Sequence, residues 1–272
     1  PPTQSVARTV YPRIIKPELH SGIFALDATS QELIWIIGPV LATFAAAQIS
    51  TEFAMVLMAL IQAIGMLIFL GDKNVRSTVI EKTEKRIGHV MKNRQVLILI
   101  VLGSVLVASF AGMEIPTVAL LDKSVSGIVV ALFSIGSIIG GLTLGHRNHT
   151  KWAPSIFFAL ALVGYSVSLF NPTNPIWLSI CWFVGGVAVA PLLGTINAMI
   201  SVITHDADAL EAYGWLATGQ LLGYAAAAVS VGFLIDNVSA ASGLLVAIGF
   251  GLVGLCVSLM SVETMPKLPS AH

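Results

Sequence analysis

Charged residues are scarce in this chain, and their scarcity excludes an ordinary soluble fold. Only 10% of the 272 residues are Asp, Glu, Lys or Arg, whereas soluble domains average about 25%. The formal net charge is zero, which gives no sign of a nucleic acid or another polyanionic partner. Hydrophobic residues make up 56% of the chain, and its mean hydropathy is +0.89. This composition predicts a protein embedded in a lipid bilayer.

The apolar stretches also lack the groups that would support an enzyme or a metal site. Cys181 and Cys256 both lie inside apolar stretches, where packing is the expected role and no disulfide framework is indicated. All six histidines fall in predicted loops or tails, and no phosphate-binding G-x-x-x-x-G-K-[ST] loop occurs. The polar ring or re-entrant filter of a channel is not visible either. We therefore expect no catalytic residue, no metal and no cofactor.

Long runs without charge mark the helices that cross the bilayer. A spanning helix needs about 20 apolar residues, and the longest run, 152–205, has room for two helices divided at "NPTNP". The predicted fold is an all-α membrane protein with eight transmembrane helices. They lie near residues 32–50, 53–70, 96–120, 124–145, 153–170, 175–202, 211–235 and 240–262.

One long polar segment divides these helices into two and six. Residues 71–95 carry seven basic and three acidic side chains, and the other connections are short. We predict a complete six-helix half preceded by two helices of an incomplete half. The segments are an inside loop or interfacial segment (1–30), the last two helices of the N-terminal half (31–70), a central cytoplasmic loop (71–95), the C-terminal six-helix half (96–262) and a cytoplasmic tail (263–272).

The basic residues predict the orientation in the membrane. With both ends of the chain inside, the inside segments hold 13 of the 14 Lys and Arg residues, and the outside loops hold Lys123 alone. Basic residues concentrate in cytoplasmic loops. The sequence therefore predicts a multi-pass protein with both ends in the cytoplasm.

Three stretches carry a family resemblance: "FALDATSQELIWIIGPVLA" (24–42), "SFAGMEIPTVAL" (109–120) and "FSIGSIIGGLTLGHR" (133–147). In this order they resemble the fifth, seventh and glycine-rich eighth helices of the major facilitator superfamily, in particular of bacterial efflux permeases of the sugar and drug type. The resemblance covers helices five to twelve, and it implies a secondary transporter in the bacterial cytoplasmic (inner) membrane. It also implies that four earlier helices are needed for a full cavity.

Glu114 is the candidate for proton coupling or gating. It lies about 28 Å from Gln95 along the predicted helix, at ~1.5 Å per residue, and so in the outer half of the membrane. Acids inside the membrane are costly and usually functional. Pro116 removes a backbone hydrogen bond beside it and loosens the helix. The alternative is an acid hydrogen-bonded to a neighbouring helix near the outer interface, without a functional role.

Asn197, Gln220 and Tyr224 are the candidates for the substrate cavity. Gln220 and Tyr224 share one helix face with Tyr213, and Asn197 follows Pro191 on a helix that the proline is expected to break. The alternatives are a Gln220 side chain that bridges two helices and a structural kink at Pro191.

Asp27, Gln31 and Glu32 lie at the inside end of the first predicted span. The family resemblance implies a cytoplasmic gate there, and solvation at the level of the lipid headgroups explains these residues equally well.

The resulting hypothesis is a secondary active transporter that exports a small solute, with protons as the candidate coupling ion, present here as a fragment or truncated form. The alternative is a non-transporting membrane scaffold or sensor derived from a transporter. The expected partners are the small-molecule solute and the lipid bilayer, with no nucleic acid.

Overall fold

The computed structural model describes residues 3–77, 88–145, 150–204, 206–266 and 268. Parts of the predicted central loop (71–95) and tail (263–272) lie outside these residues. Within them every regular element is a helix, which confirms the all-α prediction. The helices are α1 (Thr3–Ile14), α2 (His20–Gln48), α3 (Thr51–Gly71), α4 (Lys73–Ser77), α5 (Arg94–Leu120), α6 (Lys123–Leu144), α7 (Ala153–Ser168), α8 (Pro175–Gly186), α9 (Val189–Ile203), α10 (Asp206–Asn237) and α11 (Leu244–Met260), with short 3₁₀ turns at Pro17–Leu19, His89–Lys92, Ala240–Gly243 and Val262–Thr264.

The predicted inside loop or interfacial segment at 1–30 is largely helical among its described residues. It contains α1, and α2 begins at His20, twelve residues before the predicted start of the first span. A charge ends an apolar run in the sequence, but it does not end a helix when a partner neutralises it. Asp27 has such a partner, because Arg8 on α1 forms an ion pair with it.

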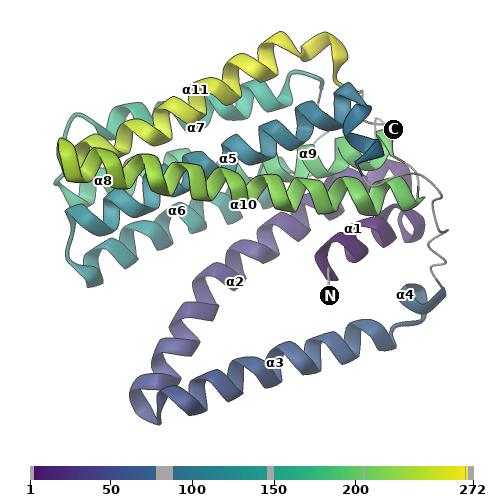
Figure 1. Cartoon of the computed structure of the whole chain (residues 1–272), viewed down its shortest axis with the longest axis horizontal. Helices are drawn as coiled ribbons and strands as arrows, with labels where there is room; N and C mark the ends of the chain where they lie inside the picture. The colour runs from purple at the N-terminus through teal and green to yellow at the C-terminus, as the bar shows by residue number, and fades with distance from the viewer. Residues whose placement is uncertain (1–2, 78–87, 146–149, 205, 267, 269–272) are drawn as a thin grey trace.

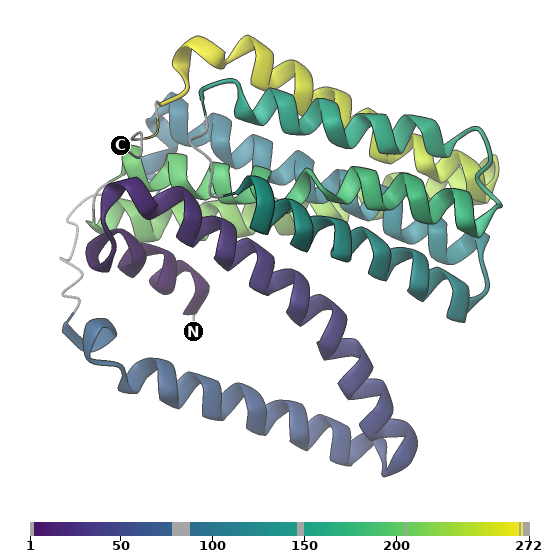
Figure 2. The same cartoon turned by 180° about the vertical axis from the view of Figure 1, so that it is seen from behind.

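Helices α5 to α11 form the main bundle (Figures 1 and 2). In α5, 67% of the apolar window is buried. This helix packs along α10 on one side and α11 on another, while α8 lies between α6 and α7. Fully buried aromatic side chains fill the space between them, including Trp182, Tyr165, Phe133 and Phe158. Apolar helices in lipid gain little from burial alone, so packing and hydrogen bonds hold such a bundle together.

Glycines let the helices of this bundle approach closely. A Cβ at Gly140 would collide with the backbone oxygen of Val187, and one at Gly141 would collide with the Thr29 hydroxyl. Small residues at this spacing are typical of close helix contacts in membranes. The glycine-rich face of α6 therefore positions both the α8–α9 segment and α2.

Helices α2 and α3 leave the main bundle. The first half of α2 packs against α6 and α9, and its second half diverges from them toward α3, as both views show. Only 6% of the apolar window in α3 is buried. Large apolar side chains such as Leu60, Ile64 and Leu67 are exposed along it.

Six segments of the described residues are long and apolar enough to cross a membrane. They are Thr51–Gly71, Arg94–Leu120, Val125–Leu144, Pro175–Ile203, Asp208–Asn237 and Ala240–Met260. The other two predicted spans correspond to α2, which carries Asp27 and Glu32, and to α7, which has 16 residues. The count of eight crossings therefore stays a prediction.

Candidate functional site

Glu114 and Tyr224, which the sequence analysis assigned to two separate sites, lie together. The Tyr224 hydroxyl donates a hydrogen bond to Glu114 Oε2 at 3.1 Å, joining α5 to α10. Both side chains are half-buried, beside a small apolar cluster that includes Ala108, Ala111 and Ala227. An acid at this depth thus has one polar partner from a neighbouring helix. Among the described residues, no basic side chain is recorded as a partner of either group.

Gly112 and Pro116 lie on a different face of α5 from Glu114. A Cβ on Gly112 would collide with the backbone of α11 at Val246 and Ala247, and the Pro116 ring lies against Gly243. The proline has no N–H to donate to the Gly112 carbonyl, so the helix loses one internal hydrogen bond at this point. Glu114 is therefore held on a segment that is tightly packed on one side and weakened internally.

Asn197, Gln220 and Tyr224 lie in different surroundings. Asn197 is fully buried in α9, and its side-chain oxygen and nitrogen have no hydrogen-bond partner among the described residues. Gln220 is half-buried on α10 with its amide close to Gly103 of α5, one helical turn from Tyr224. The structure records contacts for Gln220 with α5 and for Tyr224 with Glu114, and none of these involves Asn197.

Asp27 and Gln31 belong to a polar cluster with two residues of α1. Arg8 Nε and Nη2 both lie 2.9 Å from Asp27 Oδ2. The Tyr11 hydroxyl donates to Oδ1 at 3.1 Å, and Gln31 Nε2 donates to Oδ2 at 3.0 Å. Burial, and then the charge of Asp27, raise the pKa of Tyr11 to about 12, so the phenol stays a donor at neutral pH. The cluster ties α1 to α2.

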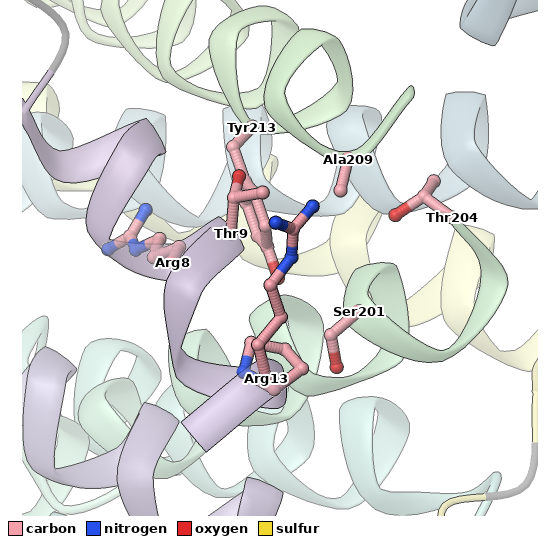
Figure 3. A pocket seen from close by; sticks show the side chains of 8 residues that line it. Arg8, Thr9, Arg13, Ser201, Thr204, Ala209 and Tyr213 are labelled. Carbon is pink, nitrogen blue, oxygen red and sulfur yellow. The ribbon is translucent and has the colours of Figure 1, made fainter. Parts of the chain in front are cut away.

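A cavity of about 180 Å³ lies next to this cluster, between α1, α9 and α10. In Figure 3 the Arg13 side chain points from α1 toward Tyr213 and Ala209. Arg8 also lines the cavity, but its guanidinium group points away from Tyr213. Tyr213 is buried, and its hydroxyl donates to the backbone oxygen of Asn197 at 3.0 Å. The cavity therefore has a basic and a phenolic wall at the end of the bundle where α9 ends and α10 begins.

Glu32 lies apart from Asp27 and Gln31, although the sequence grouped the three. Its Oε1 accepts a hydrogen bond from the Ser137 hydroxyl of α6 at 3.0 Å. The Ser137 oxygen in turn accepts the Ala190 N–H of α9 at 3.1 Å. Glu32 thus faces the junction of α6 with the α8–α9 break. Within the described residues no group of three His, Cys, Asp or Glu side chains lies close enough to hold a metal ion.

The sequence analysis did not identify Arg8, Tyr11 and Ser137 as partners of the acids. Arg8 and Tyr11 were assigned to an inside loop or interfacial segment, and without a predicted helix at 3–14 nothing placed them on one helix face. Ser137 looked like one more small residue in the glycine-rich helix. One signal was present, because Arg8 is the first basic residue of the chain and Asp27 is its first acid after Glu18.

The model of the Major Facilitator Superfamily matches residues 119–271, from the last turn of α5 to beyond α11. No curated protein matches the sequence. The match covers more than half of the chain and every helix after α5, and Glu32 and Glu114 precede it. The protein is therefore a multi-pass membrane protein that belongs to the Major Facilitator Superfamily of transporters.

Proposed function

We propose that the protein works as a secondary transporter that exports a small solute in exchange for protons, with Glu114 as the residue that carries the proton. Family membership supports transport of a small solute. The resemblance of residues 24–42 and 109–120 to efflux permeases supports export across the bacterial cytoplasmic membrane, with both chain ends inside.

The hydrogen bond between Tyr224 and Glu114 is the observation that carries this proposal. It joins two helices in the predicted outer half of the membrane, and a lone charge costs up to about 2.5–3.5 kcal/mol at the membrane centre on insertion scales. A proton on Glu114 removes that charge, and its release restores a carboxylate that the Tyr224 hydroxyl stabilises. Loading and unloading of the proton therefore changes the bond between α5 and α10.

Asn197, Gln220 and Tyr224 remain the proposed contacts of the solute. The Asn197 amide has no protein partner among the described residues, and a buried amide costs free energy unless it is hydrogen-bonded. A polar solute or a water molecule would satisfy it. Gln220 and Tyr224 present polar groups one turn apart on α10, next to the proton site.

Asp27 and Gln31 are the proposed inside gate, together with Arg8. Their cluster fixes α1 against the start of α2, beside the cavity of Figure 3. A solute that enters from the cytoplasmic side would have to separate α1 from α9 and α10 there. We assign Glu32 a separate role, described in the next subsection.

The exposed apolar surface of α3 supports a larger assembly. Only 6% of its apolar window is buried within the described residues. We propose that further helices of the N-terminal half cover this surface and complete the cavity, so that the residues described here act as part of a twelve-helix transporter or as a truncated form of one.

Transport by the full-length protein in proteoliposomes tests the proposal. The vesicles would contain a pH-sensitive dye, and ethidium and a panel of simple sugars would be the solutes. Glu114→Gln should abolish solute-driven proton movement, and Tyr224→Phe should reduce it by about fivefold, the effect of losing one hydrogen bond. Glu263→Gln, which changes an acid that is 86% exposed, is the matched control.

Unchanged proton-linked transport in Glu114→Gln would remove that residue from the mechanism. If no solute moved protons through the wild-type protein, the scaffold or sensor function would become the better explanation. Robust transport by the 272 residues alone would contradict the proposed need for further helices.

A further inference from the structure

Glu32 lies deeper in the membrane than the sequence indicated. Because α2 begins at His20, Glu32 is about 18 Å along the helix, at a rise of ~1.5 Å per residue. The residue it faces, Ala190, lies near the middle of the 29-residue crossing Pro175–Ile203. A carboxyl group at this level is remote from the headgroups that would solvate it.

The helix opposite Glu32 is broken. The break between α8 and α9 falls at residues 187–188, and Ala190 lies in the first turn of α9, where backbone N–H groups have no partner within the helix. The Ala190 N–H donates to Ser137 Oγ, and the same hydroxyl donates to Glu32 Oε1. Ser137 is fully buried, so water does not replace either bond. One hydroxyl therefore links the carboxyl group to the end of a half-helix.

This link joins the two predicted halves of the transporter. Glu32 lies on α2, in the incomplete N-terminal half, whereas Ser137 and Ala190 lie in the six-helix half. Close contacts of Gly141 with Thr29 and of Gly194 with Ala25 hold the same stretch of α2 against α6 and α9. Rocking of one half against the other is the usual way to alternate access, and it would have to break this bond.

The surroundings of Glu32 favour a proton over a metal cation. On α6 the side chains that face it are the hydroxyls of Ser134 and Ser137, and α9 carries no charged residue. Arg8 on α1 and Asp27 on α2 are paired with each other. From α7 the phenol of Tyr165 lies near enough to interact with the Glu32 charge.

The remaining neighbour of α2 is α3, whose acid Glu52 lies at the far end of α2, next to the exposed turn at residues 49–50. The positive end of α9 stabilises a carboxylate and opposes a metal ion. A proton needs no further oxygen ligands, and the described residues around Glu32 supply no basic partner that would hold the carboxylate permanently charged.

We propose that Glu32 is a second proton site, and that its ionised form holds α2 against α6 and α9 through Ser137. Protonation adds H⁺ from water to a carboxylate oxygen and gives a neutral carboxylic acid, with no leaving group. The Ser137 hydroxyl then loses a charged acceptor, and the charge-assisted bond becomes a weaker neutral one. The effect of this step on the transport cycle rests on the proposed function, whereas proton binding itself does not.

Infrared difference spectroscopy of the full chain in lipid bilayers measures the proton directly. Lowering the pH should produce one carboxylic C=O band for each glutamate that takes up a proton. The Glu32 band is the one that Glu32→Gln removes and Glu114→Gln retains. Ser137→Ala should keep the band and raise its frequency, because the carboxyl group loses its hydrogen-bond donor. Ser230→Ala is the matched control, since that hydroxyl bonds only to the carbonyl of Ala226 in its own helix.

Hydrogen exchange at the Ala190 amide measures the contact between the halves. At one fixed pH, the Ala190 N–H should exchange at least about tenfold faster in Ser137→Ala than in wild type, because this N–H loses the Ser137 oxygen that accepts its hydrogen bond. Ser230→Ala should leave the rate unchanged. The pH titration of the carboxylic band and the comparison with Ser137→Ala do not need Glu32→Gln. The proposal can therefore be tested even if Glu32→Gln does not fold.

Three results would overturn the proposal. If Glu32→Gln removed none of the wild-type bands, the proton would be assigned elsewhere, and a Glu32 band frequency unchanged in Ser137→Ala would separate Glu32 from the helix break. Loss of the band on adding Na⁺ at constant pH would make the site a cation site. None of these readouts uses transport, so the proposed export through Glu114 can fail while Glu32 still titrates, and the reverse also holds.

Discussion

Replacing Arg8 with Met should destabilise the protein far more than replacing a lysine whose acidic partner is exposed. The Arg8 side chain is 2% exposed and its partner Asp27 10% exposed, with the nitrogen and oxygen 2.9 Å apart. Removing one partner of a buried pair typically costs about 3–5 kcal/mol, because it leaves an uncompensated charge. Asp27 keeps hydrogen bonds from Tyr11 and Gln31, so we expect the lower end of this range, about 3 kcal/mol.

Thermal unfolding in detergent, followed by tryptophan fluorescence, measures this loss. For a chain of this size about 1 kcal/mol corresponds to 2–4 °C, so Arg8→Met should lower Tm by about 6–12 °C. The control is Lys151→Met, because Lys151 Nζ lies 2.7 Å from Glu263 but the glutamate is 86% exposed. Exposed pairs contribute about 0–1 kcal/mol, and this variant should shift Tm by at most about 4 °C.

The double variant Arg8→Met/Asp27→Leu extends the argument. Removing both charges leaves no unpaired ion, so the double variant should recover most of the stability lost in Arg8→Met. If Arg8→Met shifted Tm no more than Lys151→Met, the Arg8–Asp27 pair would not be buried in solution. The packing of α1 against α2 would then be wrong.

Two further predictions concern Tyr11 on α1 and Gly140 on α6. The pKa of Tyr11 is raised from 10 to about 12, so the stability that its neutral phenol contributes is complete below about pH 10 and is lost as the pH rises through about 12. The difference in Tm between wild type and Tyr11→Phe should therefore shrink over that interval; a constant difference would contradict the hydrogen bond to Asp27. Gly140→Ala should cost about 1–3 kcal/mol in denaturant unfolding, because the new methyl group meets the Val187 carbonyl. Gly127→Ala, with nothing within 4 Å of its added carbon, is the control, and an equal effect of the two would refute the close approach of α6 to the helix break.

The start of α2 shows why helix boundaries were harder to predict than helices. The charge-free run begins at Leu33, and the predicted first span began beside it. The helix itself begins at His20, because Arg8 neutralises Asp27 and Ser137 binds Glu32. A prediction from charge-free runs places a helix boundary at each acid. In the folded chain the helix continues through an acid when a side chain of another helix forms an ion pair or hydrogen bond with it.

The candidate site shows the same limit. Glu114 and Tyr224 were each selected from the sequence, one for its charge and the other for its helix face. Their hydrogen bond connects residues 110 positions apart, and it exists only because α5 and α10 pack along each other. No periodicity within one helix predicts such a pair.

The sequence by itself determined that this chain is a helical membrane protein, because lipid penalises charge and unpaired backbone groups so strongly that apolar runs become helices. It also placed acids at membrane depth, including Glu114. The tertiary structure alone decided which side chains meet: Arg8 with Asp27, Tyr224 with Glu114, and Glu32 with the α8–α9 break through Ser137. Those pairings depend on close helix approach at a few glycines, and that geometry is a property of the packed bundle rather than of any one segment.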